Sequence, residues 1–580
     1  MQPSLLPEVQ CSRSCTAYNR SRIYSLPPLD SFYNTFPCSL ITKTIKLHKS
    51  TTNDHRLKIR GFTSKLVALD TSYPWRAITT HKMFLAFIFV FIGSLVNAQQ
   101  GTVQLSPTAT VTGEACCSTG TAPGFVYYGV RYGNAQRFQH STENEDYSFL
   151  LNATRPKFGP VCPQTGPEVD GKVMSEDCLY LDIYVPPIPA GTSPQLPVLM
   201  FIYGGGLQGG TKDTFNASSL VADINAIVVM MNYRVGALGF LSTGDEAAKG
   251  NYGLGDCKVA VKWIQKHISK FGGDPNALTV FGESAGAGLT SALILGREKS
   301  IRSSLRAVAL LSGSILIDIA YNREPKKSAV EVAQKAGCPT GSSLELVNCL
   351  KQLPLDDLLR HSAYDGVSPT LPYAFVVDGE HIPDVPIRSL QAGAGSATRA
   401  PHVLTGYLRE DTSFLLQGIE PELNDPSKPV TMDQLRNIVA RRYLPTKEGG
   451  LAQCQTPDPA VINRILQRYN ITSTTNRDDT IWKFFHLATD SQFGHQAVRE
   501  SLLYANGTGT SQLYRIDYDP GMGLGAFHTL EIMHMFSPIV QLNLTFDERL
   551  VKAFGICCAS WRITEKWMGR TLVQPASTCK

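Results

Sequence analysis

The sequence has little charge and no apolar run long enough to be a typical membrane span. Only 18% of its 580 residues are charged, against roughly 25% in an average soluble domain, whereas 43% are hydrophobic. This composition excludes a disordered or collagen-like chain and permits a large core. There is no internal repeat, and no Cys and His residues stand at the spacing of a zinc site. We therefore expect a globular protein without a metal centre.

A surplus of positive charge is also missing from most of the chain. Residues 1–82 contain 12 Lys and Arg against 4 Asp and Glu, but residues 99–580 contain 42 against 45. One broad basic face for nucleic acid is therefore not expected in the part that folds. We expect residues 1–82 to be an N-terminal extension that is disordered or absent from the mature protein.

The one marked apolar run, residues 84–96, is about 13 residues long, short of the roughly 20 that a membrane-spanning helix needs. Small residues follow it at the spacing of a signal peptidase site, up to Ala98. The run therefore predicts a signal peptide over residues 83–98 and a secreted protein with no stable membrane span. A signal anchor with a cytosolic basic tail is the alternative, which the positive-inside rule favours.

Cysteines and glycosylation sequons agree with export. Cys162 with Cys178, and Cys338 with Cys349, enclose short loops that disulfides can close in an oxidising compartment. Free thiols in the core are the alternative. Five Asn-x-Ser/Thr sequons are candidate N-glycosylation sites, at Asn152, Asn216, Asn470, Asn506 and Asn543.

Short apolar runs without polar alternation predict buried strands whose two faces are both covered. They lie at residues 197–203, 226–231, 277–281, 307–311, 403–405 and 513–516. Helical periodicity appears between strands, for example over residues 259–268. This alternation predicts an α/β fold with a mainly parallel central sheet and helices on both faces. Ligand sites in such sheets lie beyond the carboxyl ends of the strands.

Two glycine motifs follow predicted strands. Gly282-Glu-Ser-Ala-Gly286 is a G-x-S-x-G sequence between a strand and a helical stretch, which predicts a strained turn that exposes the Ser284 hydroxyl as a nucleophile. An ordinary turn with a capping Ser is the alternative. Gly204-Gly205-Gly206 follows another strand, and it predicts backbone N–H donors for an oxyanion. We assign these donors to Gly205 and Gly206, with the amide of Ala285.

These motifs resemble type-B carboxylesterases, the cholinesterase-like branch of the α/β-hydrolase fold. The matching segments are residues 175–186, 203–206, 232–241, 250–256, 271–275 and 281–286. The resemblance implies an α/β-hydrolase fold and one catalytic domain over residues 99–580. It weakens after Trp567, which suggests a C-terminal truncation.

The resemblance also implies an acid and a base. The segment from Gly406 to Phe414 aligns with the family's acidic segment and puts the acid at Asp411. A slip of one residue, which makes Glu410 the acid, stays open. The base is His528, which follows a late strand, and His534 is its nearest rival. The order Ser, Asp, His along the chain is that of α/β-hydrolases.

Further residues take supporting roles by the same resemblance. Glu283 and Ser312 support the three catalytic groups from their surroundings. Ion pairs are implied between Arg137 and Glu176, and between Arg234 and Asp256.

The resemblance implies a secreted serine carboxylic ester hydrolase that works through an acyl-enzyme and needs no cofactor. The segment between Cys162 and Cys178 lacks the aromatic residue that holds choline in some members, so we expect small-molecule or lipid esters without charge. Activity should fall below about pH 6–6.5 where the pKa of His528 is unshifted. A catalytically weak cholinesterase-like adhesion or binding protein is the alternative function, and a lipase is an intermediate one.

Overall fold

The computed structural model describes most of the chain between residues 101 and 536. The described ranges are 101–117, 123–148, 157–188, 192, 194–364, 371–392, 401–420, 423, 428–443, 458–473, 475–505 and 510–536. The predicted N-terminal extension and signal peptide lie outside these residues, as do Asn152, Asn506 and Asn543.

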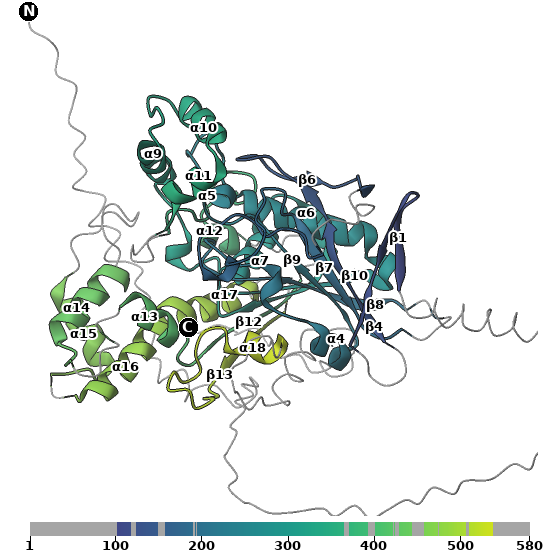
Figure 1. The fold of residues 1–580 in the computed structure, drawn as a ribbon. Helices are drawn as coiled ribbons and strands as arrows, with labels where there is room; N and C mark the ends of the chain where they lie inside the picture. The colour runs from purple at the N-terminus through teal and green to yellow at the C-terminus, as the bar shows by residue number, and fades with distance from the viewer. Residues whose placement is uncertain are drawn as a thin grey trace, which may run out of the picture. The chain divides into compact units, whose positions relative to one another are not determined.

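A nine-stranded sheet forms the centre of the described part (Figure 1). In spatial order its strands are β13 (Ser511–Ile516), β12 (His402–Leu408), β11 (Leu305–Leu311), β10 (Gly273–Glu283), β8 (Leu196–Ile202), β9 (Ile227–Met231), β7 (Tyr180–Val185), β4 (Gly124–Arg131) and β3 (Glu114–Cys116). The six strands from β13 to β9 are parallel, and the last three pair antiparallel. The predicted mainly parallel sheet is confirmed.

Most of the apolar runs form strands because both of their faces are covered. The expected burial is wrong for the run at residues 513–516, because it lies in β13 at the edge of the sheet, where Ile516 alone of that strand is buried. All residues of β9 are buried, and so are all but one residue of β8. Strands with two covered faces lack polar alternation, as the sequence does. Two further hairpins lie outside the main sheet, β1 (Thr102–Ser106) with β2 (Ala109–Thr112), and β5 (Gly133–Asn134) with β6 (Thr142–Glu143).

Helices pack on the sheet from two sides. The helices of this part of the chain are α4 (Ser218–Ile224), α5 (Gly236–Phe240), α6 (Tyr252–His267), α7 (Ala285–Leu295), α8 (Lys299–Ser304), α9 (Pro325–Lys335), α10 (Ser343–Gln352), α11 (Leu355–Ser362), α12 (Pro386–Gln391), α17 (His495–Ala505) and α18 (Leu530–Phe536). Of these, α9, α10 and α11 pack mainly against one another and α5. In Figure 1, α6 and α7 lie on one side of the sheet, and α4 and α18 on the other. Phe536 of α18 contacts Phe201 of β8, with ring centroids 4.9 Å apart.

Four helices in the green part of Figure 1 enclose an apolar cluster of their own. They are α13 (Ser413–Ile419), α14 (Met432–Ile438), α15 (Pro459–Arg468) and α16 (Arg477–Thr489). Leu416, Leu435, Leu466 and Phe484 are buried in this cluster. The helix α13 begins two residues after Asp411, the acid predicted from the sequence, so the cluster lies next to that residue in the chain.

A buried ion pair fixes the start of α6. Arg234 lies in the loop after β9, and its Nε and Nη2 atoms donate to the two carboxylate oxygens of Asp256 at 2.8 and 2.7 Å. Both side chains are almost completely buried. The implied pair between Arg137 and Glu176 is also present, at 3.1 Å from Nε to Oε2.

We expect Arg234→Met to lower the free energy of unfolding by about 3–5 kcal/mol, because it leaves the Asp256 carboxylate buried without its charged partner. Arg388→Met is the matched control, since Arg388 is 65% exposed and pairs with Asp384 on the surface. Urea unfolding followed by far-UV circular dichroism measures both. Equal midpoints for the two variants would contradict the expected role of the buried pair.

Candidate active site

Ser284 lies in a strained turn between the carboxyl end of β10 and the first residue of α7. Its φ is 57° and its ψ is −123°, a conformation that costs a non-glycine residue on the order of 1–3 kcal/mol. Glycine is required on both sides. A Cβ atom at Gly282 would collide with the carbonyl of Gly286, and one at Gly286 would collide with the carbonyl of Ile202. The turn therefore depends on both glycines of the G-x-S-x-G motif.

His528 and Asp411 meet beyond the ends of β13 and β12. Nδ1 of His528 lies 2.6 Å from Oδ1 of Asp411, and both side chains are buried. Oδ2 of Asp411 accepts a hydrogen bond of 2.9 Å from the backbone N–H of Leu408. The carboxylate is thus held by its own loop and faces the imidazole with one oxygen.

The two rival residues have other partners. Oε1 of Glu410 lies 2.9 Å from Nε2 of His486, and its Oε2 accepts from the backbone N–H of Ala526 at 2.9 Å. His534 lies within α18, and its Nδ1 is 2.7 Å from the carbonyl oxygen of Leu530. Of the alternatives that the sequence left open, the structure thus brings Asp411 to His528, and keeps Glu410 and His534 in other contacts.

The second nitrogen of His528 faces Glu283. Nε2 lies 3.2 Å from Oε1 of Glu283, and the structure has no hydrogen bond between Nε2 and the Ser284 hydroxyl among the described residues. Catalytic hydrogen bonds of this kind are often long without substrate and tighten in the complex. Ser284, His528 and Glu283 nevertheless line one cavity.

Burial and charge shift the pKa values of this pair. Burial raises the pKa of Glu283 to about 7, although the positive charge of His528 opposes the shift. Burial lowers the pKa of His528, but the carboxylates of Glu283 and Asp411 outweigh it and raise that pKa to about 9. The ordinary imidazole pKa expected from sequence does not hold here, because two buried carboxylates stabilise the charged ring.

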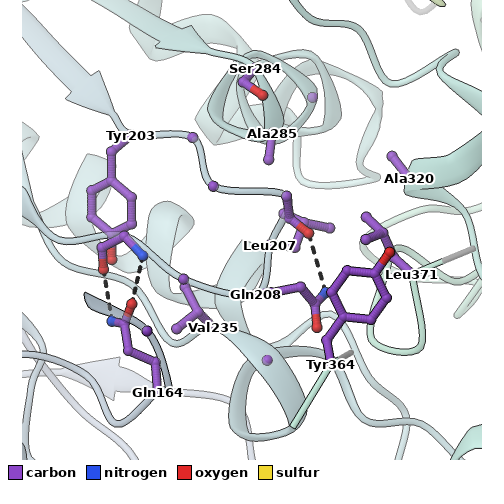
Figure 2. A pocket seen from close by; sticks show the side chains of 18 of the residues that line it. Gln164, Tyr203, Leu207, Gln208, Val235, Ser284, Ala285, Ala320, Tyr364 and Leu371 are labelled. Carbon is purple, nitrogen blue, oxygen red and sulfur yellow. Dashed lines mark hydrogen bonds between the residues drawn. The ribbon is translucent and has the colours of Figure 1, made fainter. Parts of the chain in front are cut away.

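The glycine-rich loop, residues 204–210, runs past Ser284 (Figure 2). Gly205, Gly206 and Leu207 have φ values of 100°, 62° and 64°. Among the described residues, no acceptor binds the backbone N–H groups of Gly205 and Gly206. Ala285 is the first residue of α7, so its N–H is also without a partner inside the helix. These are the three donors that the sequence predicts.

Three neighbours of the site were not singled out in the sequence. Glu531 lies one turn after His528, and its Oε1 accepts from the Ser312 hydroxyl. Burial, aided by the charges of Asp411 and Glu283, raises the pKa of Glu531 to about 8. The ring of Phe493 lies 5.0 Å from that of His528, between centroids. Only Glu531 had a sequence signal, its position in the segment that carries His528. The third neighbour, Gln164, accepts a hydrogen bond from the backbone N–H of Gly210 in the glycine-rich loop.

A cavity of about 820 Å³ opens in front of these residues. Among the described residues, only Glu283 and His528 contribute charged side chains to its wall. Most of the other side chains are apolar, including Leu359, Leu371, Phe414 and Phe493, as Figure 2 shows in part. The cavity can therefore take an uncharged organic group next to a hydroxyl, an imidazole and backbone donors.

Two predicted disulfides are present, Cys162–Cys178 and Cys338–Cys349. Cys116 and Cys117 form a third, between neighbouring residues, and Cys257 is a buried free thiol. Of the described sequons, Asn470 is exposed and open to solvent, whereas Asn216 is half-buried.

Within the described ranges, every helix is too short or too polar to cross a membrane.

Comparisons with known proteins agree with this fold. The model of the carboxylesterase family matches residues 99–555. Carboxylesterase 1D of Mus musculus is 30% identical over 430 residues, which cover 69% of this chain and 72% of that protein. Bile salt-activated lipase of Rattus norvegicus is 35% identical over 281 residues, 45% of this chain and 44% of the lipase. Neuroligin-3 of Mus musculus is 34% identical over 314 residues, 46% of this chain.

The matched stretch spans only 37% of neuroligin-3 itself, so that relative extends well beyond the shared region. The family model, in contrast, covers the chain from before β1 to beyond α18. The chain belongs to the carboxylesterase family.

Proposed function

We propose that this protein is a secreted serine carboxylic ester hydrolase that acts on uncharged esters. The contact that carries the proposal is the 2.6 Å approach of His528 Nδ1 to Asp411 Oδ1, at the cavity that Ser284 and the glycine-rich loop line. A carboxylate on Nδ1 orients the imidazole and stabilises its charged form, which is what a general base for a serine requires.

The reaction is acyl transfer to water. His528 takes the proton of the Ser284 hydroxyl as Oγ bonds to the ester carbonyl, and the carbonyl electron pair becomes an alkoxide that the amides of Gly205, Gly206 and Ala285 bind. The protonated His528 then gives its proton to the leaving alcohol. Water repeats these steps on the acyl-enzyme, and the acid leaves.

The cavity wall supports an uncharged substrate. A cationic group would find no aromatic cage among the residues between Cys162 and Cys178, where Gln164 lines the cavity instead. An anionic acyl group would approach the Glu283 carboxylate and, in the described part of the wall, find no cationic side chain other than His528. Neutral esters of small molecules or lipids suit these surroundings.

Secretion belongs to the same proposal. The apolar run over residues 84–96 suits a signal peptide, and the disulfides Cys162–Cys178 and Cys338–Cys349 suit an oxidising compartment. We keep residues 1–82 as an extension, residues 83–98 as the signal peptide and residues 99–580 as one catalytic domain. The five sequons are its proposed glycosylation sites.

We expect Ser284→Ala to lower kcat for 4-nitrophenyl butyrate by about 10⁴-fold or more, because the nucleophile is lost. The variant should also lose the covalent adduct that a fluorophosphonate forms, read by mass spectrometry. Ser219→Ala, an exposed position on α4, is the control and should keep both properties. A wild-type protein with neither turnover nor adduct would favour the adhesion or binding function instead.

The acid can be identified with two amide variants. We expect Asp411→Asn to lower kcat by about 10⁴-fold, because the amide no longer stabilises a charged imidazole. Glu410→Gln keeps an oxygen for the Ala526 amide and should lower kcat by less than about tenfold. Steady-state kinetics at one pH distinguishes them, and the reverse order of effects would assign the role to Glu410.

The pH profile should depend on Glu283. His528 must be neutral to act, so its raised pKa moves the acidic limb of kcat/KM above the pH of about 6–6.5 for an unshifted imidazole. Glu283→Gln removes a negative charge 3.2 Å from Nε2 and should move that limb to lower pH by about one unit or more. Glu246→Gln, which is exposed, serves as control. An unmoved or rising midpoint would argue against the contact.

A further inference from the structure

Gln164 links the segment between Cys162 and Cys178 to the far end of the glycine-rich loop. Its Oε1 accepts from the backbone N–H of Gly210 at 2.7 Å, and its Nε2 donates to the Gly210 carbonyl at 2.9 Å. The side chain therefore pairs with one residue of the loop through both ends of its amide. It is only 4% exposed, so water does not compete for these bonds.

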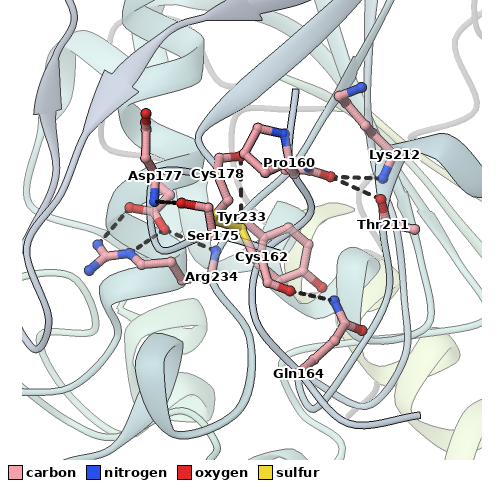
Figure 3. Close-up of a disulfide and its surroundings, with 12 residues drawn as sticks. Pro160, Cys162, Gln164, Ser175, Asp177, Cys178, Thr211, Lys212, Tyr233 and Arg234 are labelled. Atoms are coloured by element: carbon pink, nitrogen blue, oxygen red, sulfur yellow. Dashed lines mark hydrogen bonds and ion pairs between the residues drawn. A yellow bond between two sulfur atoms is a disulfide. The ribbon is translucent and has the colours of Figure 1, made fainter. Parts of the chain in front are cut away.

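The anchor of Gln164 is rigid. Nε2 also donates to the Cys162 carbonyl at 3.0 Å, and Cys162 is bonded through its sulfur to Cys178, two residues before β7 (Figure 3). The two amide hydrogens of Gln164 thus go to Cys162 and Gly210, which fixes which end of the amide is oxygen. The loop is tied through this side chain to the central sheet.

Gln208 holds the near end of the loop. Its Nε2 donates to the Gly206 carbonyl at 3.2 Å, next to Leu207 in Figure 2, and to the Tyr373 carbonyl at 2.6 Å. Tyr373 belongs to a segment far along the chain, so this amide fastens the loop to a second part of the fold. The bonded carbonyl is that of Gly206, one of the two loop residues whose N–H groups have no acceptor among the described residues.

The loop needs such support. Three successive residues, Gly205 to Leu207, have positive φ values, and Leu207 is not a glycine. Positive φ is strained at a residue other than glycine, so the backbone does not hold this shape without contacts from other parts of the fold. Donors assist an alkoxide only if they already point at it before the reaction.

We propose that Gln164 and Gln208 are positioning residues that hold the Gly205 and Gly206 amides in place for the oxyanion. Neither residue needs to touch the reacting carbonyl. Each acts through the backbone of the loop, one at Gly210 and the other at Gly206. This inference rests on the proposed hydrolase function, and it adds the side chains that preorganise its oxyanion site.

The test compares Gln164→Glu and Gln208→Met with Gln265→Met. Gln164→Glu keeps the size of the side chain but removes both donors, and Gln208→Met removes both donors at a half-buried position. Gln265 is the matched control, because its Nε2 makes a similar bond of 2.6 Å to the Pro275 carbonyl away from the cavity. The probes are 4-nitrophenyl butyrate and an aryl trifluoromethyl ketone. Ser284 Oγ adds to the carbonyl carbon of the ketone and gives its proton to His528. The carbonyl oxygen of the ketone becomes the alkoxide.

We expect each loop variant to lower kcat by about 10- to 100-fold with KM within about threefold of the wild type. Affinity for the trifluoromethyl ketone should fall with kcat, because both depend on the alkoxide. The control should stay within about twofold in every constant. Unchanged kcat and ketone affinity in both loop variants, with normal unfolding midpoints, would overturn the proposal, as would a change in KM alone.

Hydrogen exchange of the peptide that covers residues 204–210 gives a readout independent of turnover. Faster exchange in both loop variants than in Gln265→Met supports the positioning role, and equal exchange contradicts it. A wild-type protein that neither hydrolyses the ester nor binds the ketone refutes the proposed function, and exchange then decides alone whether the two glutamines hold the loop.

Discussion

The close packing of the Ser284 turn against the end of β8 is the constraint on which the site depends. Gly286 of α7 lies against the carbonyl of Ile202, the last residue of β8, with no room for a Cβ atom. The glycine-rich loop begins two residues later. One backbone contact therefore sets the distance between Ser284, the proposed nucleophile, and the glycine-rich loop. A larger residue at position 286 would push α7 away from the end of β8 and so from the glycine-rich loop.

A second constraint is electrostatic. Three carboxyl groups, those of Asp411, Glu283 and Glu531, are buried around one imidazole. They cannot all be ionised at little cost in a site from which water is excluded, and burial raises the pKa of Glu283 to about 7 and that of Glu531 to about 8. The negative charge that remains on this cluster stabilises the protonated form of His528, whose pKa is raised to about 9. No Lys or Arg lines the described part of the cavity wall. The wall therefore stays suited to neutral groups.

The parts of the fold with local signals could be predicted from the sequence. Apolar runs marked β8, β9, β10 and β11, because two covered faces remove polar alternation. Ser284 was also predicted from a local signal, because a turn this tight admits only glycine at positions 282 and 286. The family resemblance supplied the register that placed Asp411 rather than a neighbour in the acid position.

Contacts between distant segments could not be predicted in this way. Gln208 meets Tyr373 across more than one hundred residues of sequence, and nothing near either residue indicates the partner. The raised pKa of His528 had the same origin, because it depends on burial and on Glu283, whose side chain points at Nε2 only once the chain has folded. The helical cluster of α13 to α16 was also missed, since its apolar residues are scattered among exposed ones.

The scaffold by itself does not decide between catalysis and binding. Relatives named carboxylesterase, lipase and neuroligin share it with this chain at 30–35% identity, so function must be argued from the site. The strained Ser284 and the buried carboxyl groups each lower the stability of the folded protein. A surface that only binds another protein gains nothing from any of them. Their presence together at one cavity therefore supports the proposed ester hydrolysis over a function in binding alone.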